Sequence, residues 1–448
     1  MFINAIDTTK EIETALPPLG LGYLVSSLRQ EFGPEHIEFK IVDRQIEEQI
    51  KIFKPHIVGI TSVSQNYSKA IEYAKVAKKY SLPVIIGGVH ISALPSTLTN
   101  DMDVGVIGEG EGTIVELFYL FTRKEHFDKK ELAKVEGVVF RNGKNRIVVT
   151  EQRKPIEPLD RIPVPARDMF RIKQSAYMFT SRGCPYRCTF CASCRFWGRV
   201  RFFSAEYVVK EIKDLISKYK VRKITFWDDL FVANKKRLKR LLALMKKEEI
   251  LGKVKFGCNI RSNLVTDELI LLLKKMNVKS VGMGLESGSP ASLKYLKGNN
   301  ISINGNISAI KTLRKFGIKL HTGFIIGSPQ ESRADILQTL AFIRENRIDG
   351  FNIYVLTPFP GTPVWDYARM RNLVSEDMDW SALNVNFGAS HANAIILSEK
   401  LTREEIYELF LLFADIKKKR KIKRALRNPK SLLKILVKTL SRQPLIER

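Results

Sequence analysis

Cysteine is scarce in this chain of 448 residues, and long hydrophobic runs are absent. The five cysteines, three of them in one short segment, do not suggest a disulfide framework, so a reducing, cytoplasmic setting is expected. The longest apolar runs, ELILLL and ELFLLF, are far too short to cross a bilayer. The opening MFINAIDTTKEIE lacks a basic start followed by an apolar stretch, so no secretory signal is expected.

Acidic residues are outnumbered, with 47 Asp and Glu against 74 Lys and Arg and a net charge of +27. Residues 417–448 carry thirteen Lys and Arg against one acid, Glu447, which is +12 of the total. Apolar residues between Leu432 and Leu440 alternate with Lys430, Lys434 and Lys438. This basic amphipathic pattern is compatible with a peripheral membrane contact, with nucleic acid, which is less favoured, or with simple solubilisation.

Strands and helices alternate along the first 125 residues, which predicts a doubly wound, Rossmann-like parallel sheet. The expected strands cover residues 38–43, 56–62, 83–88 and 103–108. Ligands of such sheets bind beyond the carboxyl ends of the strands, where glycines let a large molecule approach the backbone. Taken singly, these positions could equally be ordinary turns. They hold Ser62, Ser64, Gly87, Gly88, His90, Gly108, Glu109 and Gly110.

A second alternating region follows a mixed segment, residues 127–170, in which Asn142-Gly143 predicts a hairpin and a proline-rich stretch predicts a linker. Strands are expected at residues 223–227, 254–259, 280–286, 320–327 and 351–356. With one strand before the cysteines, about six units form a partial (β/α)6 barrel with its site at the strand carboxyl ends. The expected division is 1–126, 127–170, 171–390, and a basic helical segment at 391–448.

Three cysteines lie in the run SRGCPYRCTFC with the spacing C-x3-C-x2-C: Cys184, Cys188 and Cys191. Three thiolates on one loop can hold a 4Fe–4S cluster and leave its fourth iron open to another ligand. A three-cysteine zinc site is the alternative on spacing alone. Cys194 is interpreted as a bystander or a fourth ligand, and Cys258 as a core residue.

This motif resembles the signature of the radical SAM superfamily, in which S-adenosylmethionine (SAM) chelates the open iron. The resemblance implies that Phe190 packs near the adenine and that Asp228 or Asp229 receives the methionine amino group. It also implies that Glu286 binds the ribose hydroxyls. An Asp pair that caps a helix and a solvated acid at a strand end are the competing structural interpretations.

The run GFIIGSPQE fits the pattern that the superfamily uses for backbone contact with adenine, which implies roles for Gly323, Ile325 and Gly327. A buried strand followed by a tight turn is the alternative. Arg261 could meet the methionine carboxylate or the substrate, or form a structural salt bridge.

The order PPLGLGYL, VGITSVS, IIGGVH and VIGEGEGT resembles the cobalamin-binding domain found ahead of many radical SAM enzymes. This resemblance implies that the strand-end residues given above bind cobalamin. The D-x-H-x-x-G motif is absent, so His90 is not assigned as a cobalt ligand, and the lower face of the corrin is expected to lack a protein histidine. TPFPGTPVW is typical of the cobalamin-linked branch.

Together, these resemblances imply an oxygen-sensitive enzyme that makes a 5′-deoxyadenosyl radical and methylates an unactivated carbon, or a phosphinate-like phosphorus, of a small molecule or lipid. An electron donor such as flavodoxin or ferredoxin is then required. Oxidative cyclisation or ring rearrangement stays open, as does a non-catalytic cobalamin or metal sensor. Methylthiolation is not favoured, because no cysteine precedes Cys184.

Overall fold

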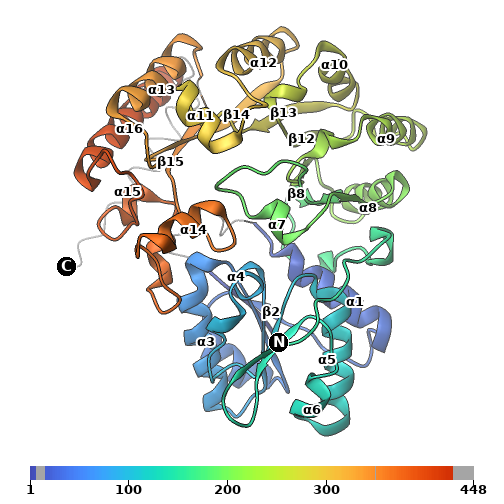
Figure 1. The fold of residues 1–448 in the computed structure, drawn as a ribbon. Helices are drawn as coiled ribbons and strands as arrows, with labels where there is room; N and C mark the ends of the chain where they lie inside the picture. The colour runs from blue at the N-terminus through green and yellow to red at the C-terminus, as the bar shows by residue number, and fades with distance from the viewer. Residues whose placement is uncertain (7–15, 349, 427–448) are drawn as a thin grey trace, which may run out of the picture.

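The computed structural model describes residues 1–6, 16–348 and 350–426, which form two α/β units (Figure 1). The cysteine loop and the short helix α7 (Ser193–Phe196) lie between the barrel and the N-terminal unit in this view. The expected combination of a doubly wound N-terminal unit, a partial barrel and a C-terminal helix is confirmed.

The N-terminal unit is built on a seven-stranded sheet with the order β2-β1-β3-β4-β5-β6-β7. Its first five strands are parallel. Helices cover both faces, α2 and α3 on one and α1 and α5 on the other. The bounds are β1 Phe2–Ala5, α1 Leu19–Phe32, β2 Ile41–Val42, α2 Ile46–Phe53, β3 Val58–Ser62, α3 Tyr67–Lys79, β4 Val84–Gly87, α4 Val89–Ala93, β5 Val104–Val106 and α5 Gly110–Lys124.

The hairpin predicted at Asn142-Gly143 is present, formed by β6 (Val138–Arg141) and β7 (Ile147–Val149). It follows the short helix α6 (Lys129–Leu132) and pairs antiparallel with β5. The N-terminal sheet therefore continues past residue 126, into the segment that the sequence assigns to a linker. The following proline-rich stretch is pinned to both units, because Leu159 and Ile162 are buried in the barrel core and Ala166 N–H donates to the Gly22 carbonyl (3.0 Å).

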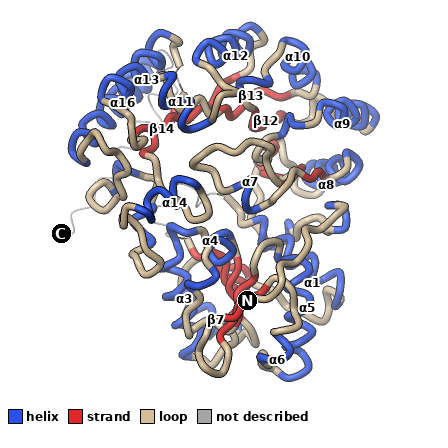
Figure 2. Tube along the Cα trace, viewed as in Figure 1, coloured by secondary structure: helices blue, strands red, loops and turns tan. Residues whose placement is uncertain are grey.

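The second unit is a six-stranded, fully parallel sheet with the order β15-β14-β13-β12-β11-β8. Figure 2 shows its helices as an outer layer around the curved strands. The strands are β8 Ser175–Met178, β11 Lys223–Phe226, β12 Lys255–Ile260, β13 Val278–Met283, β14 Lys319–Ile326 and β15 Phe351–Val355. The helices are α8 Ala205–Ser217, α9 Lys235–Lys247, α10 Asp267–Lys275, α11 Pro290–Lys297, α12 Ile303–Lys315, α13 Arg333–Glu345 and α14 Pro363–Met370.

Six consecutive barrel helices, α8 to α13, begin at a polar N-cap whose side chain accepts a backbone N–H of the first turn. Each such cap satisfies a donor that the helix cannot satisfy itself, and is worth about 1 kcal/mol. A capping residue in the sequence thus fixes where each of these helices begins. The caps are Ser204, Asn234, Thr266, Ser289, Ser302 and Ser332.

The C-terminal region begins with the short helix α15 (Phe387–Ser390), and α16 (Arg403–Leu426) then packs on the barrel through Ile406, Leu409 and Phe413. In the part of the chain that the structure describes, no helix is long and apolar enough to span a membrane. The predicted amphipathic segment around Leu432 to Leu440 lies outside the described residues.

The barrel core contains a stack of three phenylalanines, and we expect its loss to be costly. Phe226 is fully buried, with ring centroids 4.4 Å from Phe231 and 5.2 Å from Phe256. Replacing Phe226 by Ala should lower the free energy of unfolding by about 3–5 kcal/mol, because the substitution leaves a cavity that the neighbouring side chains cannot fill completely. The matched change of exposed Leu271 to Ala should cost less than about 0.5 kcal/mol. Urea unfolding measures both, and equal losses would contradict the assigned core.

Candidate functional site

The cysteine loop is held at its start by a two-residue antiparallel pair, β9 (Ser181–Arg182) with β10 (Arg201–Phe202). Gly183 follows with φ +93°, and a Cβ there would lie 2.7 Å from the Arg199 carbonyl oxygen, so this turn requires glycine. Cys188 is buried, and Cys184 and Cys191 are half-buried. The fold thus places all three motif cysteines on one tethered loop.

The thiols of this loop lie close enough to influence each other's ionisation. Burial raises the pKa of Cys191 to about 11, with smaller contributions from Asp229, Cys188 and Cys184. Burial also raises the pKa of Cys184. Such thiols stay protonated at neutral pH unless a metal centre supplies positive charge, so the donor set fits an iron–sulfur cluster. In the described residues, no three or more His, Cys, Asp or Glu side chains lie close enough together to bind one mononuclear metal ion.

The other two cysteines lie outside this set. Cys258 is buried in β12, as expected for a core residue, and burial raises its pKa far above the usual range. Cys194 is half-buried in α7, with its sulfur 3.7 Å from a nitrogen of Arg195.

The adjacent acids Asp228 and Asp229 have different environments. Asp228 is fully buried and accepts hydrogen bonds from Thr180 N (2.6 Å), Thr180 Oγ1 (2.5 Å) and Ser181 N (3.2 Å). Its carboxylate therefore fixes the chain just ahead of the cysteines. Asp229 borders a cavity and accepts from Ser193 Oγ (2.6 Å), so it is the acid that faces the site. Burial raises the pKa of both.

The predicted ribose and adenine residues lie side by side. Glu286 adopts a left-handed backbone conformation (φ +60°), its N–H donates to Gly323 O (3.1 Å), and its carbonyl accepts from Ile325 N (2.8 Å). The side chain of Glu286 pairs with Lys297 Nζ (3.0 Å), which also donates to Gly284 O (2.6 Å). Lys297 was not identified from the sequence, because nothing in its spacing distinguishes it from other helical lysines.

Two further predicted residues occupy defined places. Among the described residues, Arg261 has no salt bridge to an acid: its Nη1 lies 3.2 Å from Cys188 Sγ, its Nη2 donates to Lys297 O (3.2 Å), and its guanidinium lies 3.9 Å from the Tyr186 ring centre. Phe190 is half-buried and packs against the core that the two units share.

The turn after β14 is held by Glu331, which is not among the site residues predicted from the sequence. Gly327 has φ +82°, and its N–H donates to Glu331 Oε2 (2.6 Å), which also accepts from Ser328 N (3.2 Å). Glu331 is buried, and this raises its pKa to about 7. Its protonation state therefore changes close to neutral pH.

A cavity of about 300 Å³ lies between the two units. The N-terminal unit lines it with Gly87, Gly88, Gly108, Glu109 and Gly110, all predicted from the sequence. A Cβ at Gly88 (φ +105°) would lie 2.5 Å from the Ser62 carbonyl oxygen, so this turn must be glycine. The barrel side of the cavity is formed by Phe179, Ser181, Arg182, Trp197 and Asp229.

Three predicted cobalamin residues do not line this cavity. Ser62 donates to the Val63 carbonyl (2.8 Å), and Ser64 is buried. His90 is fully buried, with its ring centre 3.7 Å from that of Tyr67 and 4.4 Å from that of Trp380, and burial lowers its pKa to about 3. His90 thus belongs to an aromatic contact between α4 and the segment Trp380–Leu383, which the strand-end pattern could not reveal.

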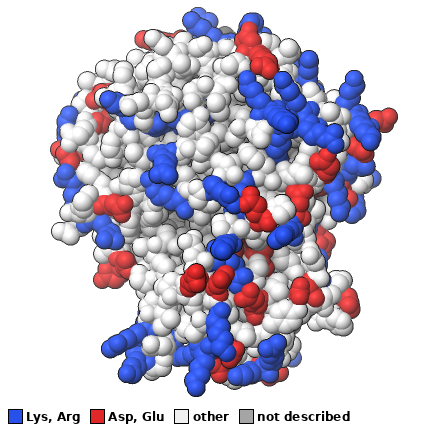
Figure 3. All heavy atoms as spheres, turned by 45° about the vertical axis from the view of Figure 1, so that its right-hand side comes forward, with Lys and Arg blue, Asp and Glu red and all other residues white. Residues whose placement is uncertain are grey.

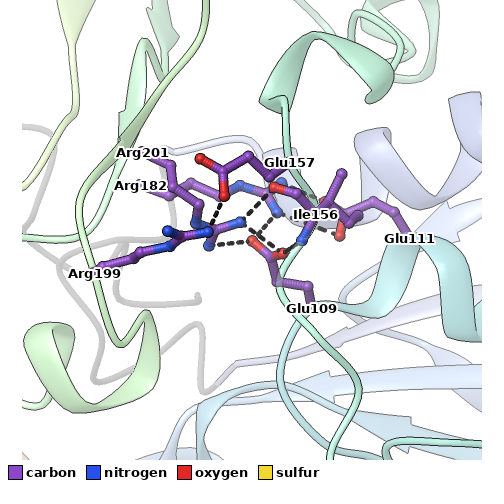
Figure 4. Close-up of polar contacts among 7 residues, drawn as sticks. All are labelled: Glu109, Glu111, Ile156, Glu157, Arg182, Arg199 and Arg201. Atoms are coloured by element: carbon purple, nitrogen blue, oxygen red, sulfur yellow. Dashed lines mark hydrogen bonds and ion pairs between the residues drawn. The ribbon is translucent and has the colours of Figure 1, made fainter.

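Glu109 has partners that its position in the sequence does not suggest. Its carboxylate pairs with Arg182 and Arg201 from the two strands beside the cysteine loop (Figure 4). Burial alone would raise the pKa of Glu109, but hydrogen bonds and charges of these two guanidiniums hold it below the usual value. Glu109 is therefore an ionised wall residue of the cavity.

Comparison with known proteins agrees with this arrangement. Residues 178–343 match the radical SAM superfamily, and residues 7–118 match the B12 binding domain. An uncharacterized methyltransferase of Pyrococcus horikoshii is 34% identical over 387 residues, which is 82% of each chain. The anaerobic magnesium-protoporphyrin IX monomethyl ester cyclase of Cereibacter sphaeroides is 26% identical over 89% of this chain and 66% of its own length.

Among solved structures, the radical SAM methyltransferase TsrM from Kitasatospora setae, with tryptophan and a SAM analogue bound, superposes with a TM-score of 0.69. It is 18% identical, and the match covers 83% of this chain and 76% of TsrM. Another TsrM structure contains cobalamin and a [4Fe–4S] cluster. The family match over residues 178–343 and the 34% identity to the Pyrococcus horikoshii protein define a radical SAM enzyme. This chain belongs to the radical SAM enzymes that carry an N-terminal cobalamin-binding domain.

The raised pKa of Glu331 predicts a pH-dependent stability. Because the folded state holds this proton more tightly than the unfolded chain, its stabilisation is complete below the ordinary glutamate pKa and is lost as pH rises through about 7. Relative to Glu331→Gln, the wild type should therefore lose about 3 kcal/mol of unfolding free energy between pH 4 and pH 8. Urea unfolding across this range measures it, and a difference that does not vary with pH would refute the assignment.

Proposed function

We propose that this enzyme uses SAM and cobalamin to methylate an unactivated carbon of a small-molecule or lipid substrate. The observation that carries this proposal is the single cavity bordered by Gly88, Gly108 and Gly110 on one side and by Ser181 and Asp229 on the other. Residues of both predicted cofactor sites thus meet around one space. The methyltransferase relatives, one of which is 34% identical, support methyl transfer as the outcome.

Cys184, Cys188 and Cys191 would hold the 4Fe–4S cluster, with Asp229, Glu286, Gly323, Ile325, Gly327 and Phe190 as candidate SAM contacts. When bound, the cluster supplies the electron that cleaves SAM, and cobalamin supplies methyl transfer. The Lys297 ammonium, 3.0 Å from Glu286, orients that carboxylate as a hydrogen-bond acceptor. Asp228 takes no direct part, because its oxygens are already bound to Thr180 and Ser181.

Cobalamin would lie against the glycine turns, whose lack of side chains leaves room for a large planar group. No histidine lines the cavity in the described part of the chain, which supports a lower corrin face without a protein imidazole. Apolar walls, among them Leu24, Ile60, Ile114, Phe179 and Trp197, would exclude water from a radical reaction.

Oxidative cyclisation is the second candidate, and the specific observation for it is the 26% identity to the magnesium-protoporphyrin ester cyclase over 89% of this chain. The two outcomes differ in mass, because methylation adds a carbon unit and cyclisation removes hydrogens.

An acidic one-electron carrier such as flavodoxin or ferredoxin would supply the reductant. Figure 3 shows basic side chains gathered at the upper right of the molecule, and α9, which lies on that side, carries Lys235, Lys236, Lys239, Lys246 and Lys247. A positive surface of this kind attracts an acidic partner and speeds its association.

Replacing Cys188 by Ala should remove the visible iron–sulfur absorbance and abolish reductive cleavage of SAM, because the cluster loses one of three ligands.

With SAM labelled in its methyl group, the reconstituted wild type should transfer the label to a compound in an anaerobic cell extract, detected by mass spectrometry. The matched variant Cys194→Ala, on the same loop but outside the motif, should keep both activities. Unchanged SAM cleavage in the Cys188 variant would refute the function, and an unlabelled product that has lost hydrogens would favour cyclisation.

We further propose that the protein works in the cytoplasm and rests on anionic membranes through the basic segment that includes Lys430, Lys434 and Lys438. Changing these three lysines to Gln should weaken co-sedimentation with phosphatidylserine vesicles roughly a hundredfold, since each lysine near such a surface contributes about 1 kcal/mol. The control changes Lys239, Lys246 and Lys247 of α9 to Gln and should bind as the wild type does. Equal binding of all three proteins would remove the membrane contact and, with it, the argument for a lipid substrate.

A further inference from the structure

Four buried charged residues join the cavity wall to the cysteine loop, and they are called here the interdomain ion network: Glu109, Glu111, Arg182 and Arg201 (Figure 4). Their side chains are only 3–9% exposed. Glu109 is the N-cap residue of α5 and Glu111 lies in its first turn, and the two arginines come from the β9–β10 pair. Two carboxylates face two guanidiniums, so the net charge of the network is zero although its side chains are almost fully buried.

Arg182 is the centre of this network. Its Nη1 lies 2.7 Å from Glu109 Oε1 and 3.4 Å from Glu111 Oε2, and its Nη2 donates to Glu111 Oε1. The guanidinium also lies over the rings of Tyr23 (5.6 Å) and Trp197 (5.1 Å), which both line the cavity. A planar guanidinium that donates to two carboxylates and contacts two aromatic rings has little freedom to move independently of them.

Glu109 is fully engaged by the protein. Its Oε1 accepts from Arg182 and Arg201 (2.7 Å each), and its Oε2 accepts from Arg201 Nη1 (2.9 Å) and from the backbone N–H of Ile156 (2.7 Å). Arg201 completes the ring through the Ile156 carbonyl (2.8 Å). Glu109 therefore holds the glycine turn against the barrel and has no oxygen left over for a ligand.

The position of Arg182 connects two sites along the backbone. It lies two residues before Cys184, on a strand pair only two residues long, so the ladder alone fixes the loop weakly. Glu109 is flanked by Gly108 and Gly110, which line the cavity. A shift of the glycine turn must therefore move Arg182, and with it the start of the cysteine loop.

We propose that Arg182 is a positioning residue that couples cobalamin binding in the cavity to the geometry of the cysteine loop. This inference rests on the proposed function, because it takes cobalamin as the ligand of the cavity. Coupling of this kind is reciprocal: if cobalamin orders the loop, a loaded cluster must raise the affinity for cobalamin by the same factor.

The test compares the dissociation constant of cobalamin for full-length protein with and without the reconstituted cluster, by absorbance titration under anaerobic conditions. In the wild type we expect the cluster to tighten cobalamin binding at least fivefold. In Arg182→Lys, which keeps the charge but loses the bidentate fork, the ratio should fall below about twofold while the cluster still assembles. Glu111→Gln, which removes one acceptor of Arg182, should give an intermediate ratio.

Arg199→Met is the matched control, because Arg199 lies just before β10, the pairing partner of the strand that carries Arg182, but pairs with Glu157 at the surface, with side chains 63% and 52% exposed (Figure 4). It should retain the wild-type ratio. Hydrogen exchange of residues 183–191 gives a second readout: cobalamin should slow it in the wild type and in Arg199→Met but not in Arg182→Lys. A wild-type ratio near one, or an unchanged ratio in Arg182→Lys, would overturn the coupling alone. Absence of any cobalamin binding by the wild type would overturn the proposed function as well.

Discussion

The structure depends on a charge-balanced contact that is buried between two separately built sheets. Glu109 and Glu111 cannot be left without Arg182 and Arg201, because removing one partner of a buried ion pair typically costs about 3–5 kcal/mol. Apolar surface alone would let the units slide against each other, whereas a forked guanidinium donates hydrogen bonds to a carboxylate in only a few orientations. The contact therefore restricts how the glycine turns face the cysteine loop, and three of its four residues, Glu109, Glu111 and Arg182, line the cavity between them.

A second constraint acts on the loop itself. Burial raises the pKa of Cys184 and Cys191, so charge on these two thiols does not fix the loop, which needs structural support from the rest of the protein. Asp228 supplies part of it, since its carboxylate fixes the backbone of Thr180 and Ser181 just before the motif. Gly183 then allows the sharp departure that brings the cysteines over the strand ends. The loop is thus organised by protein contacts that need no metal.

Much of this could be predicted from local patterns. The barrel strands are apolar runs with regular helical partners, and their prediction is confirmed. The C-x3-C-x2-C spacing is a local code, so its three cysteines can be selected from the sequence alone, and their role as cluster ligands stays a prediction. The sequence analysis does not predict strand β1, although β1 pairs with both β2 and β3 in the N-terminal sheet. The partners of Glu109 were missed because Arg201 is 92 residues away, and no spacing rule connects the two.

Strand ends illustrate the limit of sequence reasoning most sharply. Asp228 and Asp229 are neighbours, and adjacent side chains at the end of a strand point in opposite directions. One carboxylate is therefore buried beneath the loop and the other borders the cavity, yet both fit the same family position. Gly88 and His90 are separated for a different reason: the glycine lines the cavity at the N-cap of α4, while the histidine lies within α4 and enters an aromatic cluster in which burial keeps it neutral. A motif can locate the edge of a site, but only the packing on each side of the strand decides which residue enters it.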